Sequence, residues 1–117
     1  MKAFLVEQVG DKEFIASVKE VSIPKCEDNE VVIKVTYSSL NYKDALSSVG
    51  NPGVTRKFPH ITGIDVAGTV YESTSPIFKT GEKVLVTGYD MGMNSDGGHA
   101  QFVKVPAAWV ARIPDSI

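Results

Sequence analysis

The stretch 31–38 most strongly constrains the fold, because hydrophobic and polar residues alternate along it. Val31, Ile33, Val35 and Tyr37 fall on one side of an extended chain, and the polar residues that follow Ile33 fall on the other. Successive side chains of a β-strand point to opposite faces, so this pattern predicts a strand with one buried face.

Similar but weaker strand patterns recur along the chain, at 2–8, 14–21, 64–72, 83–87, 99–105 and 109–113. Residues 41–48 contain neither Gly nor Pro and predict one short helix that Gly50 closes. Many short strands with one or two short helices indicate a mainly β fold, either a barrel or a sandwich with long loops.

Composition and charge narrow the classes of protein. The chain has 117 residues, of which 43% are hydrophobic, so we expect one ordinary domain with a packed core. Twelve Lys and Arg against fourteen Asp and Glu, with no basic block, argue against nucleic acid or a membrane as partner. No apolar run approaches the roughly 20 residues that span a bilayer, and we expect a cytoplasmic protein.

Four sequence blocks occur in a particular order, at 38–46, 58–70, 80–84 and 97–102. Together they resemble the N-terminal, GroES-like domain of the medium-chain dehydrogenase/reductase superfamily, nearest the quinone oxidoreductase and acrylyl-CoA reductase-like branch. The resemblance covers essentially all of residues 1–117. It implies a GroES-like, partly open β-barrel with one or two short helices, which forms the substrate side of a cleft.

The same resemblance implies that NADPH is bound mainly by a Rossmann domain, which forms the other wall of the cleft. Residues 1–117 contain no G-x-G-x-x-G motif between a strand and a helix, so we expect that domain to lie outside this chain. The chain alone is then expected to bind NADPH poorly and to be inactive. We expect the parent protein to be a homodimer that acts on a small-molecule substrate.

Zinc-dependent relatives carry a cysteine ligand at the start of the short helix and a His-Glu pair in the second block. Here these positions hold Asn41, Ile64 and Asp65. A catalytic zinc needs three protein ligands from Cys, His, Asp or Glu, and isoleucine has no lone pair to donate. With Cys26 as the single cysteine, a four-cysteine zinc lobe is also impossible. We therefore expect no metal.

Three residues at the start of the predicted helix are candidates for catalysis: Asn41, Tyr42 and Asp44. By resemblance Asn41 lies near the nicotinamide or the substrate, although Asn is also a common helix cap. Tyr42 either stacks on the nicotinamide or is a core aromatic residue. Asp44 shares the helix face of Asn41 and either orients Asn41 or a nearby lysine, or remains a solvated acid near the helix start.

Two charged residues are expected to support the site. Asp65 lies in an otherwise apolar stretch and needs a partner, for which Arg56 and Lys57 are candidates. Asp65 either braces the floor of the cleft or supports catalysis indirectly. Arg56 and Lys57 could instead meet a phosphate of CoA or NADPH, or remain solvated.

The loop 89–96 is expected to set substrate specificity. Tyr89, Met91 and Met93 could line an apolar pocket there, because methionine adapts to irregular shapes, or the loop could be a mobile surface segment. His60 and His99 are expected to be surface or hydrogen-bonded residues without a catalytic role.

These features predict a zinc-independent, NADPH-dependent reductase of activated alkenes or quinones. A non-catalytic binding or structural module with the same fold is the alternative.

Overall fold

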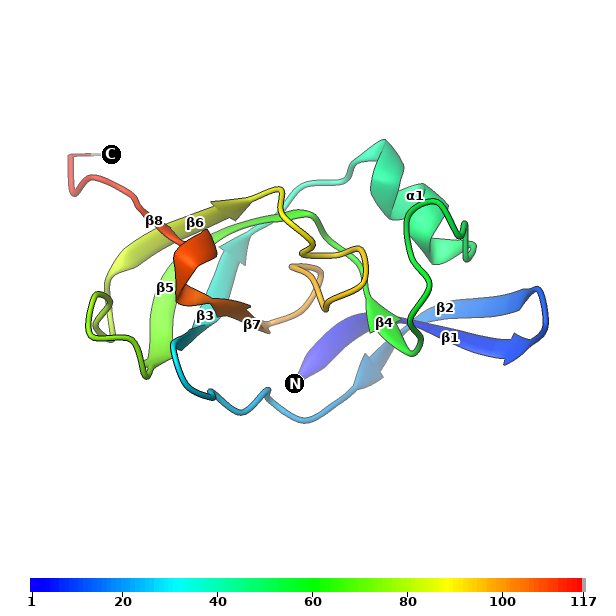
Figure 1. The fold of residues 1–117 in the computed structure, drawn as a ribbon, viewed down its shortest axis with the longest axis horizontal. Helices are drawn as coiled ribbons and strands as arrows, with labels where there is room; N and C mark the ends of the chain where they lie inside the picture. Colours follow the sequence, from blue (N-terminus) through cyan, green and yellow to red (C-terminus); the bar gives the residue numbers. More distant parts are fainter. Residues whose placement is uncertain (117) are drawn as a thin grey trace.

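Two open antiparallel sheets contain most of the regular structure of residues 1–116, which the computed structural model describes (Figure 1). The smaller sheet has the order β2-β1-β4 and the larger has the order β7-β3-β5-β6-β8. The strands are β1 (Lys2–Gly10), β2 (Glu13–Glu20), β3 (Glu30–Tyr37), β4 (His60–Ile61), β5 (Asp65–Ser73), β6 (Lys83–Thr87), β7 (Phe102–Pro106) and β8 (Ala111–Arg112). The prediction of a mainly β, GroES-like fold is confirmed, and neither sheet closes into a barrel.

The helical content is small. Among the residues described, one α-helix, α1 (Tyr42–Ser48), follows β3, and a single 3₁₀ turn, η1 (Ala107–Trp109), follows β7. Gly50 ends the helical segment with a positive φ of 75°, as its position in the sequence predicts. Within residues 1–116 no helix has the length and apolar character needed to cross a membrane.

The core lies on one face of the larger sheet and consists mainly of alternate residues along its strands, with Phe78 and Met91 added from loops. It comprises Val31, Ile33, Val66, Val70, Phe78, Val84, Val86, Met91, Val103 and Val105. This is the face that the alternation in 31–38 predicts.

Tyr37 departs from the prediction, because 74% of its surface is exposed. The pairing of β3 with β5 shifts register between Val35 and Tyr37, and such an irregularity turns the following side chains away from the core. Val32, on the opposite face of β3 from the predicted core residues, is also buried. The face of β3 that was expected to be polar is therefore covered at its start.

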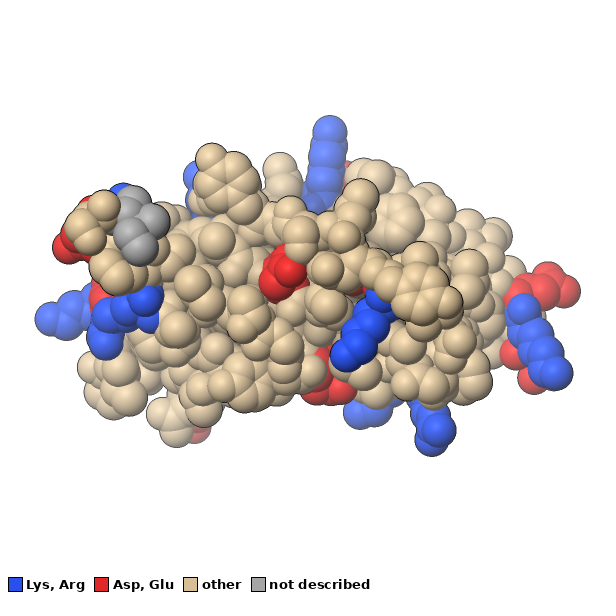
Figure 2. Space-filling model, turned by 90° about the horizontal axis from the view of Figure 1, so that it is seen from above, with Lys and Arg blue, Asp and Glu red and all other residues tan. Residues whose placement is uncertain are grey.

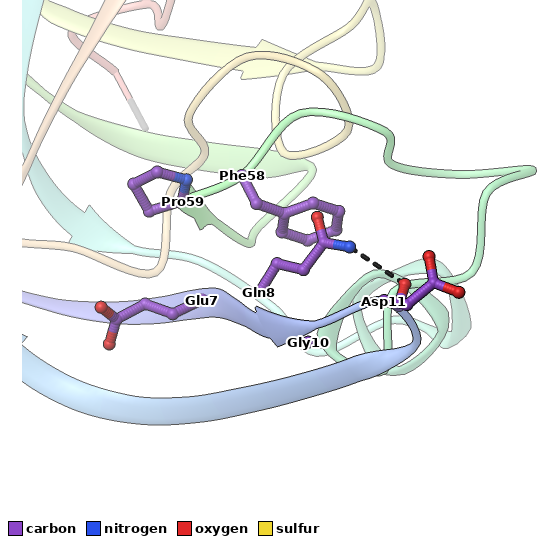
Figure 3. A pocket seen from close by; sticks show the side chains of 6 residues that line it. All are labelled: Glu7, Gln8, Gly10, Asp11, Phe58 and Pro59. Carbon is purple, nitrogen blue, oxygen red and sulfur yellow. Dashed lines mark hydrogen bonds between the residues drawn. The ribbon is translucent and has the colours of Figure 1, made fainter.

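The β1–β2 hairpin projects from the body of the molecule (Figure 1). Phe14 on β2 contacts Phe58 with ring centroids 4.8 Å apart, which ties the hairpin to the loop before β4. An open cavity of about 490 Å³ lies between this loop and the hairpin, where Gln8 donates to the carbonyl of Asp11 (Figure 3). It shares no lining residue with the cavity beside α1 described below.

Two glycine-containing turns pack directly against each other next to α1. The backbone N–H of Gly98 donates to the carbonyl of Gly63 (3.0 Å), and that of His99 donates to the carbonyl of Thr62 (2.9 Å). Gly63 has φ of 111°, a backbone conformation that residues other than glycine rarely adopt. This close backbone approach places the His99 side chain beside Thr62.

Candidate active site

The first polar residues of the site lie at the start of α1. Asn41 precedes the helix as its N-cap residue in an extended conformation. The Asp44 carboxylate accepts the backbone N–H of Asn41 (2.7 Å) and that of Gly63 (3.1 Å). Asp44 is 6% exposed, so the alternative of a solvated acid is wrong. It fixes the backbone of Asn41 and joins α1 to the turn before β5.

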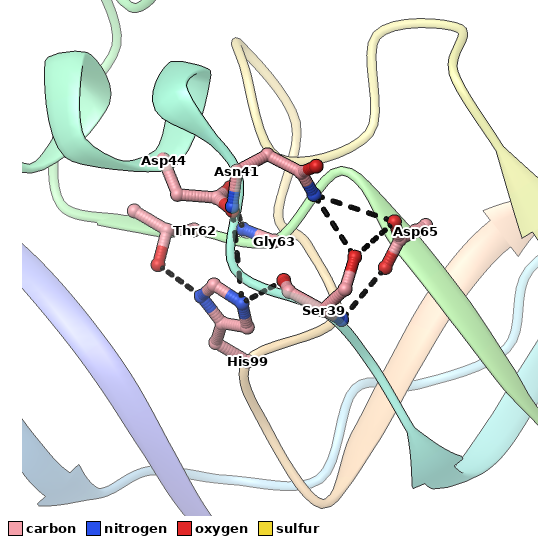
Figure 4. A network of polar contacts seen from close by, with 7 residues as sticks. All are labelled: Ser39, Asn41, Asp44, Thr62, Gly63, Asp65 and His99. Atoms are coloured by element: carbon pink, nitrogen blue, oxygen red, sulfur yellow. Dashed lines mark hydrogen bonds and ion pairs between the residues drawn. The ribbon is translucent and has the colours of Figure 1, made fainter.

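A polar cluster lies where β3 ends and β5 begins, and it consists of Ser39, Asn41 and Asp65 (Figure 4). The amide nitrogen of Asn41 lies 3.0 Å from Ser39 Oγ and 3.4 Å from Asp65 Oδ2. Asp65 also accepts the Ser39 backbone N–H (2.9 Å) and the Ser39 hydroxyl (2.5 Å). The cluster joins the end of β3 to the start of β5.

Two opposing effects set the charge of Asp65. Burial favours the neutral acid, but the hydrogen bonds from Ser39 and Asn41, together with the nearby His99, outweigh it and lower the pKa of Asp65 below its ordinary value. Asp65 is therefore a carboxylate at neutral pH and orients the amide of Asn41.

Arg56 does not support Asp65 as the sequence predicted. Its guanidinium donates to the carbonyl of Pro52 (2.9 Å), and its backbone N–H donates to Asn94 (2.8 Å). The charge of Asp65 is instead stabilised by neutral donors from Ser39 and Asn41. The expectation failed because a carboxylate in an apolar stretch needs hydrogen bonds, which neutral groups also supply.

His99 belongs to the site, although it was not among the residues predicted for it. Its Nδ1 lies 2.8 Å from Thr62 Oγ1, and its Nε2 lies 2.9 Å from the carbonyl oxygen of Ser39. The same Nε2 is 3.9 Å from the Asp44 carboxylate. The available signal was the Gly97-Gly98 pair before it, which permits the close backbone approach described above.

A cavity of about 430 Å³ opens beside these groups. It is lined by Phe4, Leu40, Asn41, Asp44, Ala45, Ser48, Thr62 and His99. Apolar side chains thus surround a small set of polar groups, which is typical of a small-molecule site. The polar groups come from α1, from the loop before it and from the two glycine-containing turns.

Tyr42 lies at the surface, with 78% of it exposed. It does not line the cavity, and the alternative of a core aromatic residue is wrong. Leu40 (87% exposed) and Val49 (67%) flank it along the chain. On the face seen in Figure 2, uncharged side chains cover much of the surface, with an acidic side chain near its middle and basic side chains around it.

The structure separates the three residues that were expected to line a pocket in the loop 89–96. Met91 is fully buried in the core of the larger sheet, so its assignment to an open pocket is wrong. Tyr89 stacks on Trp109 with ring centroids 5.3 Å apart. Met93 is partly buried, and none of the three lines the cavity beside Asn41. Methionine is as common in irregular parts of a core as in pockets, and the sequence did not distinguish these roles.

The donor set at the helix start does not fit a catalytic zinc. Among residues 1–116, no three His, Cys, Asp or Glu side chains are grouped so as to hold a metal ion. Asp44 already accepts two backbone N–H groups, and Asp65 is bound by Ser39 and Asn41. Ile64 contributes no donor atom.

A nicotinamide ring fits the cavity better than a phosphate group does. The lining offers an amide, a hydroxyl and an imidazole beside apolar side chains, which suits a flat ring bearing a carboxamide. None of the described residues that line it is Lys or Arg, and no backbone of a long helix begins there. The phosphates of a dinucleotide would have to be held by another part of the protein.

His60 lies next to this region but is enclosed. It is 2% exposed and packs edge-on against Phe58, and within the described part of the chain its Nε2 has no hydrogen-bond partner. The expectation of a surface or fully hydrogen-bonded histidine is therefore wrong. Burial lowers the pKa of His60 even though Asp96, the carbonyl of Gly92 and other nearby acids oppose the shift.

Acidification is expected to destabilise the fold through His60. Its pKa is lower in the folded protein than the ordinary value of about 6.5, so the unfolded chain binds more protons between these two values. The stability that His60 contributes is complete above about pH 6.5 and falls as the pH drops through the folded pKa. Urea unfolding should show that the free energy of unfolding is lower at about pH 5.5 than at about pH 7.5, and that this difference is smaller in His60→Met. An equal loss in both proteins would contradict this role.

Comparison with known proteins identifies the family. Residues 27–115 match the alcohol dehydrogenase GroES-like domain, and the chain therefore belongs to this family. The family is part of the medium-chain dehydrogenase/reductase superfamily, as the four sequence blocks predict.

Several proteins that resemble this chain in sequence or structure are oxidoreductases. The chain is 40% identical over 102 residues to an acrylyl-CoA reductase of Ruegeria pomeroyi, covering 87% of this chain and 31% of the relative. It is 26% identical over 119 residues to a quinone oxidoreductase of Lama guanicoe, covering 100% and 34%. An oxidoreductase from Salmonella enterica, solved in complex with NADP, superposes with a TM-score of 0.89 at 40% identity, covering 100% of this chain and 36% of that one. The chain thus spans about a third of the length of the relatives it matches.

Proposed function

We propose that this chain forms the substrate side of the active site of a zinc-independent, NADPH-dependent reductase. The substrates are activated alkenes, such as acrylyl-CoA or an enone, or quinones. The observation that carries the proposal is the Asn41–Ser39–Asp65 cluster beside an apolar cavity, at the helix start where zinc-dependent relatives carry a metal ligand. The names of the acrylyl-CoA reductase and quinone oxidoreductase relatives support the substrate class.

Asn41 is proposed to stabilise the oxygen of the substrate. Its two acceptors, Ser39 Oγ and Asp65 Oδ2, lie 2.5 Å from each other and so can share one of its amide protons. An amide nitrogen carries two protons, and the second is available to the carbonyl or quinone oxygen. The Asp65 carboxylate holds the amide in place, so that the donor is already oriented when negative charge develops on that oxygen.

NADPH, when bound, supplies the hydride that adds to the β-carbon of the alkene or to the quinone. The carboxamide-bearing end of the cofactor is proposed to lie by Asn41 and the exposed Tyr42 ring, whose face is free for contact. The described residues around the cavity include no Lys or Arg for its phosphates. We therefore propose that a Rossmann domain elsewhere in the parent protein holds them, and that this chain alone is inactive.

We propose that the parent is a cytoplasmic homodimer without a nucleic-acid or membrane partner. The formal net charge of -2 and the absence of a basic block support the second part.

A substrate panel tests the proposal on the full-length protein. With NADPH, it should reduce acrylyl-CoA, an enone or a quinone, and it should oxidise simple alcohols with NADP at least roughly 100-fold less efficiently, because no metal polarises the hydroxyl. NADH in place of NADPH serves as the cofactor control. Efficient alcohol oxidation without reduction of any alkene or quinone would contradict the proposal.

A further inference from the structure

The cavity beside α1 contains one imidazole, and both nitrogens of that ring are engaged. His99 Nε2 lies 2.9 Å from the carbonyl oxygen of Ser39, and Nδ1 lies 2.8 Å from Thr62 Oγ1. Figure 4 shows the ring held between these two partners, with Asp44 above it. Thr62 and His99 both line the cavity.

The partners of the ring determine its tautomer. A carbonyl oxygen can only accept a hydrogen bond, so Nε2 must carry the proton that points to Ser39. In the neutral ring Nδ1 is then an acceptor, and the Thr62 hydroxyl donates to it. In this state the hydroxyl proton of Thr62 is directed at His99 and not at the cavity.

Protonation of the ring reverses the second hydrogen bond. Nδ1 then donates to Thr62 Oγ1, which frees the hydroxyl proton of Thr62 to point at a ligand. Two carboxylates face the ring: that of Asp44 on α1 lies 3.9 Å from Nε2, and that of Asp65 on β5 lies nearby. The His99–Thr62 pair therefore has one state that can donate a proton to the cavity and one that cannot.

We propose that Thr62 delivers the proton that completes the reduction and that His99 replaces it, an inference that rests on the proposed function. After hydride has added to the β-carbon, the electron pair of the enolate at the α-carbon takes the hydroxyl proton of Thr62 and forms a C–H bond. The Nδ1 proton of His99 moves to Thr62 Oγ1 in the same step, and the imidazolium becomes neutral. The side chain of His99 is 12% exposed, so water can return a proton to it for the next turnover.

Neighbouring groups are less suited to this role. Both carboxylate oxygens of Asp44 already accept backbone N–H groups, from Asn41 and Gly63. Tyr42 is exposed and does not line the cavity. The amide of Asn41 is not an acid at neutral pH. The hydroxyl of Thr62, which regains its proton from the His99 imidazole, is the remaining candidate for the proton donor.

The stereochemistry of the product tests the relay in the full-length protein. Acrylyl-CoA reduced in D₂O gains one deuterium at the α-carbon, which becomes a CHD centre. The relay predicts a single configuration in the wild type and a mixture in Thr62→Val, because water then protonates from either side. It also predicts that kcat falls roughly 100-fold in Thr62→Val and His99→Gln with KM little changed, which is the usual scale of general acid catalysis.

Two further variants keep the test decisive. Thr62→Ser retains the hydroxyl and should show the wild-type rate and a single configuration. If Thr62 acted only through its methyl group, Thr62→Ser would instead be as slow as Thr62→Val. Thr36→Val, on the exposed part of β3, is the matched control and should behave as the wild type. A wild-type rate and a single configuration in Thr62→Val would overturn the relay.

A readout independent of turnover uses the ¹⁵N signals of His99 in the substrate-free protein. Their assignment comes from their loss in His99→Gln. The relay predicts a protonated Nε2 and an unprotonated Nδ1 at mildly alkaline pH, with the Nδ1 signal shifting in Thr62→Val. A protonated Nδ1 in the neutral ring would contradict it. If the wild type reduces no alkene or quinone, the proposed function fails; if it does and the variants match it, only the relay fails.

Discussion

Gly63→Ala is expected to reduce the free energy of unfolding by about 3 kcal/mol, since it combines backbone strain with a steric clash. Gly63 has φ of 111°, and an added Cβ would lie 2.6 Å from the backbone nitrogens of Gly98 and His99. These atoms belong to backbone that is held by hydrogen bonds to Gly63 and Thr62. The clash cannot be relieved by a side-chain rotation, so the two turns must separate.

Gly81→Ala provides a matched control. Gly81 also has a positive φ, of 92°, but an added Cβ would meet nothing within 4 Å. Gly81→Ala should lower the free energy of unfolding only through backbone strain, by about 1 kcal/mol. Urea unfolding of both variants measures the difference. Equal losses in the two would show that the close approach of the turns contributes nothing to stability.

Asn41→Leu is expected to lower kcat by roughly 100-fold, the loss seen when one donor to a developing negative charge is removed. Leucine has a similar size but no amide, so the cavity keeps its shape while the substrate oxygen loses its donor. The effect should fall on kcat with KM for the alkene little changed, because the contact is made most strongly in the transition state. Steady-state kinetics of the full-length protein with NADPH measure both constants.

Lys43→Leu is the control for the helix itself. Lys43 is exposed on α1, two residues from Asn41, and should keep the wild-type kcat. Thermal unfolding of both variants should show that the fold persists. A kcat of Asn41→Leu equal to that of Lys43→Leu would remove the amide from the proposed chemistry.

The sequence predicts the regular parts of the fold well, because burial of alternate residues is a local pattern. The core positions Val31 and Ile33 follow directly from it. Tyr37 does not, since a register shift between neighbouring strands is decided by their pairing and leaves no trace in the alternation. The same limit applies to Met91, whose loop folds back into the core.

The site could be predicted only in part, because its groups come from distant segments. Asn41 and Asp44 are three residues apart on one helical turn, and their proximity is local. Ser39 reaches Asp65 because β3 pairs with β5 with Tyr37 opposite Ala67. His99 meets Thr62 through a backbone approach that needs glycine on both sides. Neither contact follows from the spacing along the chain.

The most direct test of the proposed chemistry is the turnover of the full-length protein with NADPH and acrylyl-CoA after treatment with a strong chelator, together with its zinc content. An active site built around the amide of Asn41 predicts unchanged turnover and far less than one zinc atom per chain. Loss of turnover on chelation that added zinc restores would contradict it.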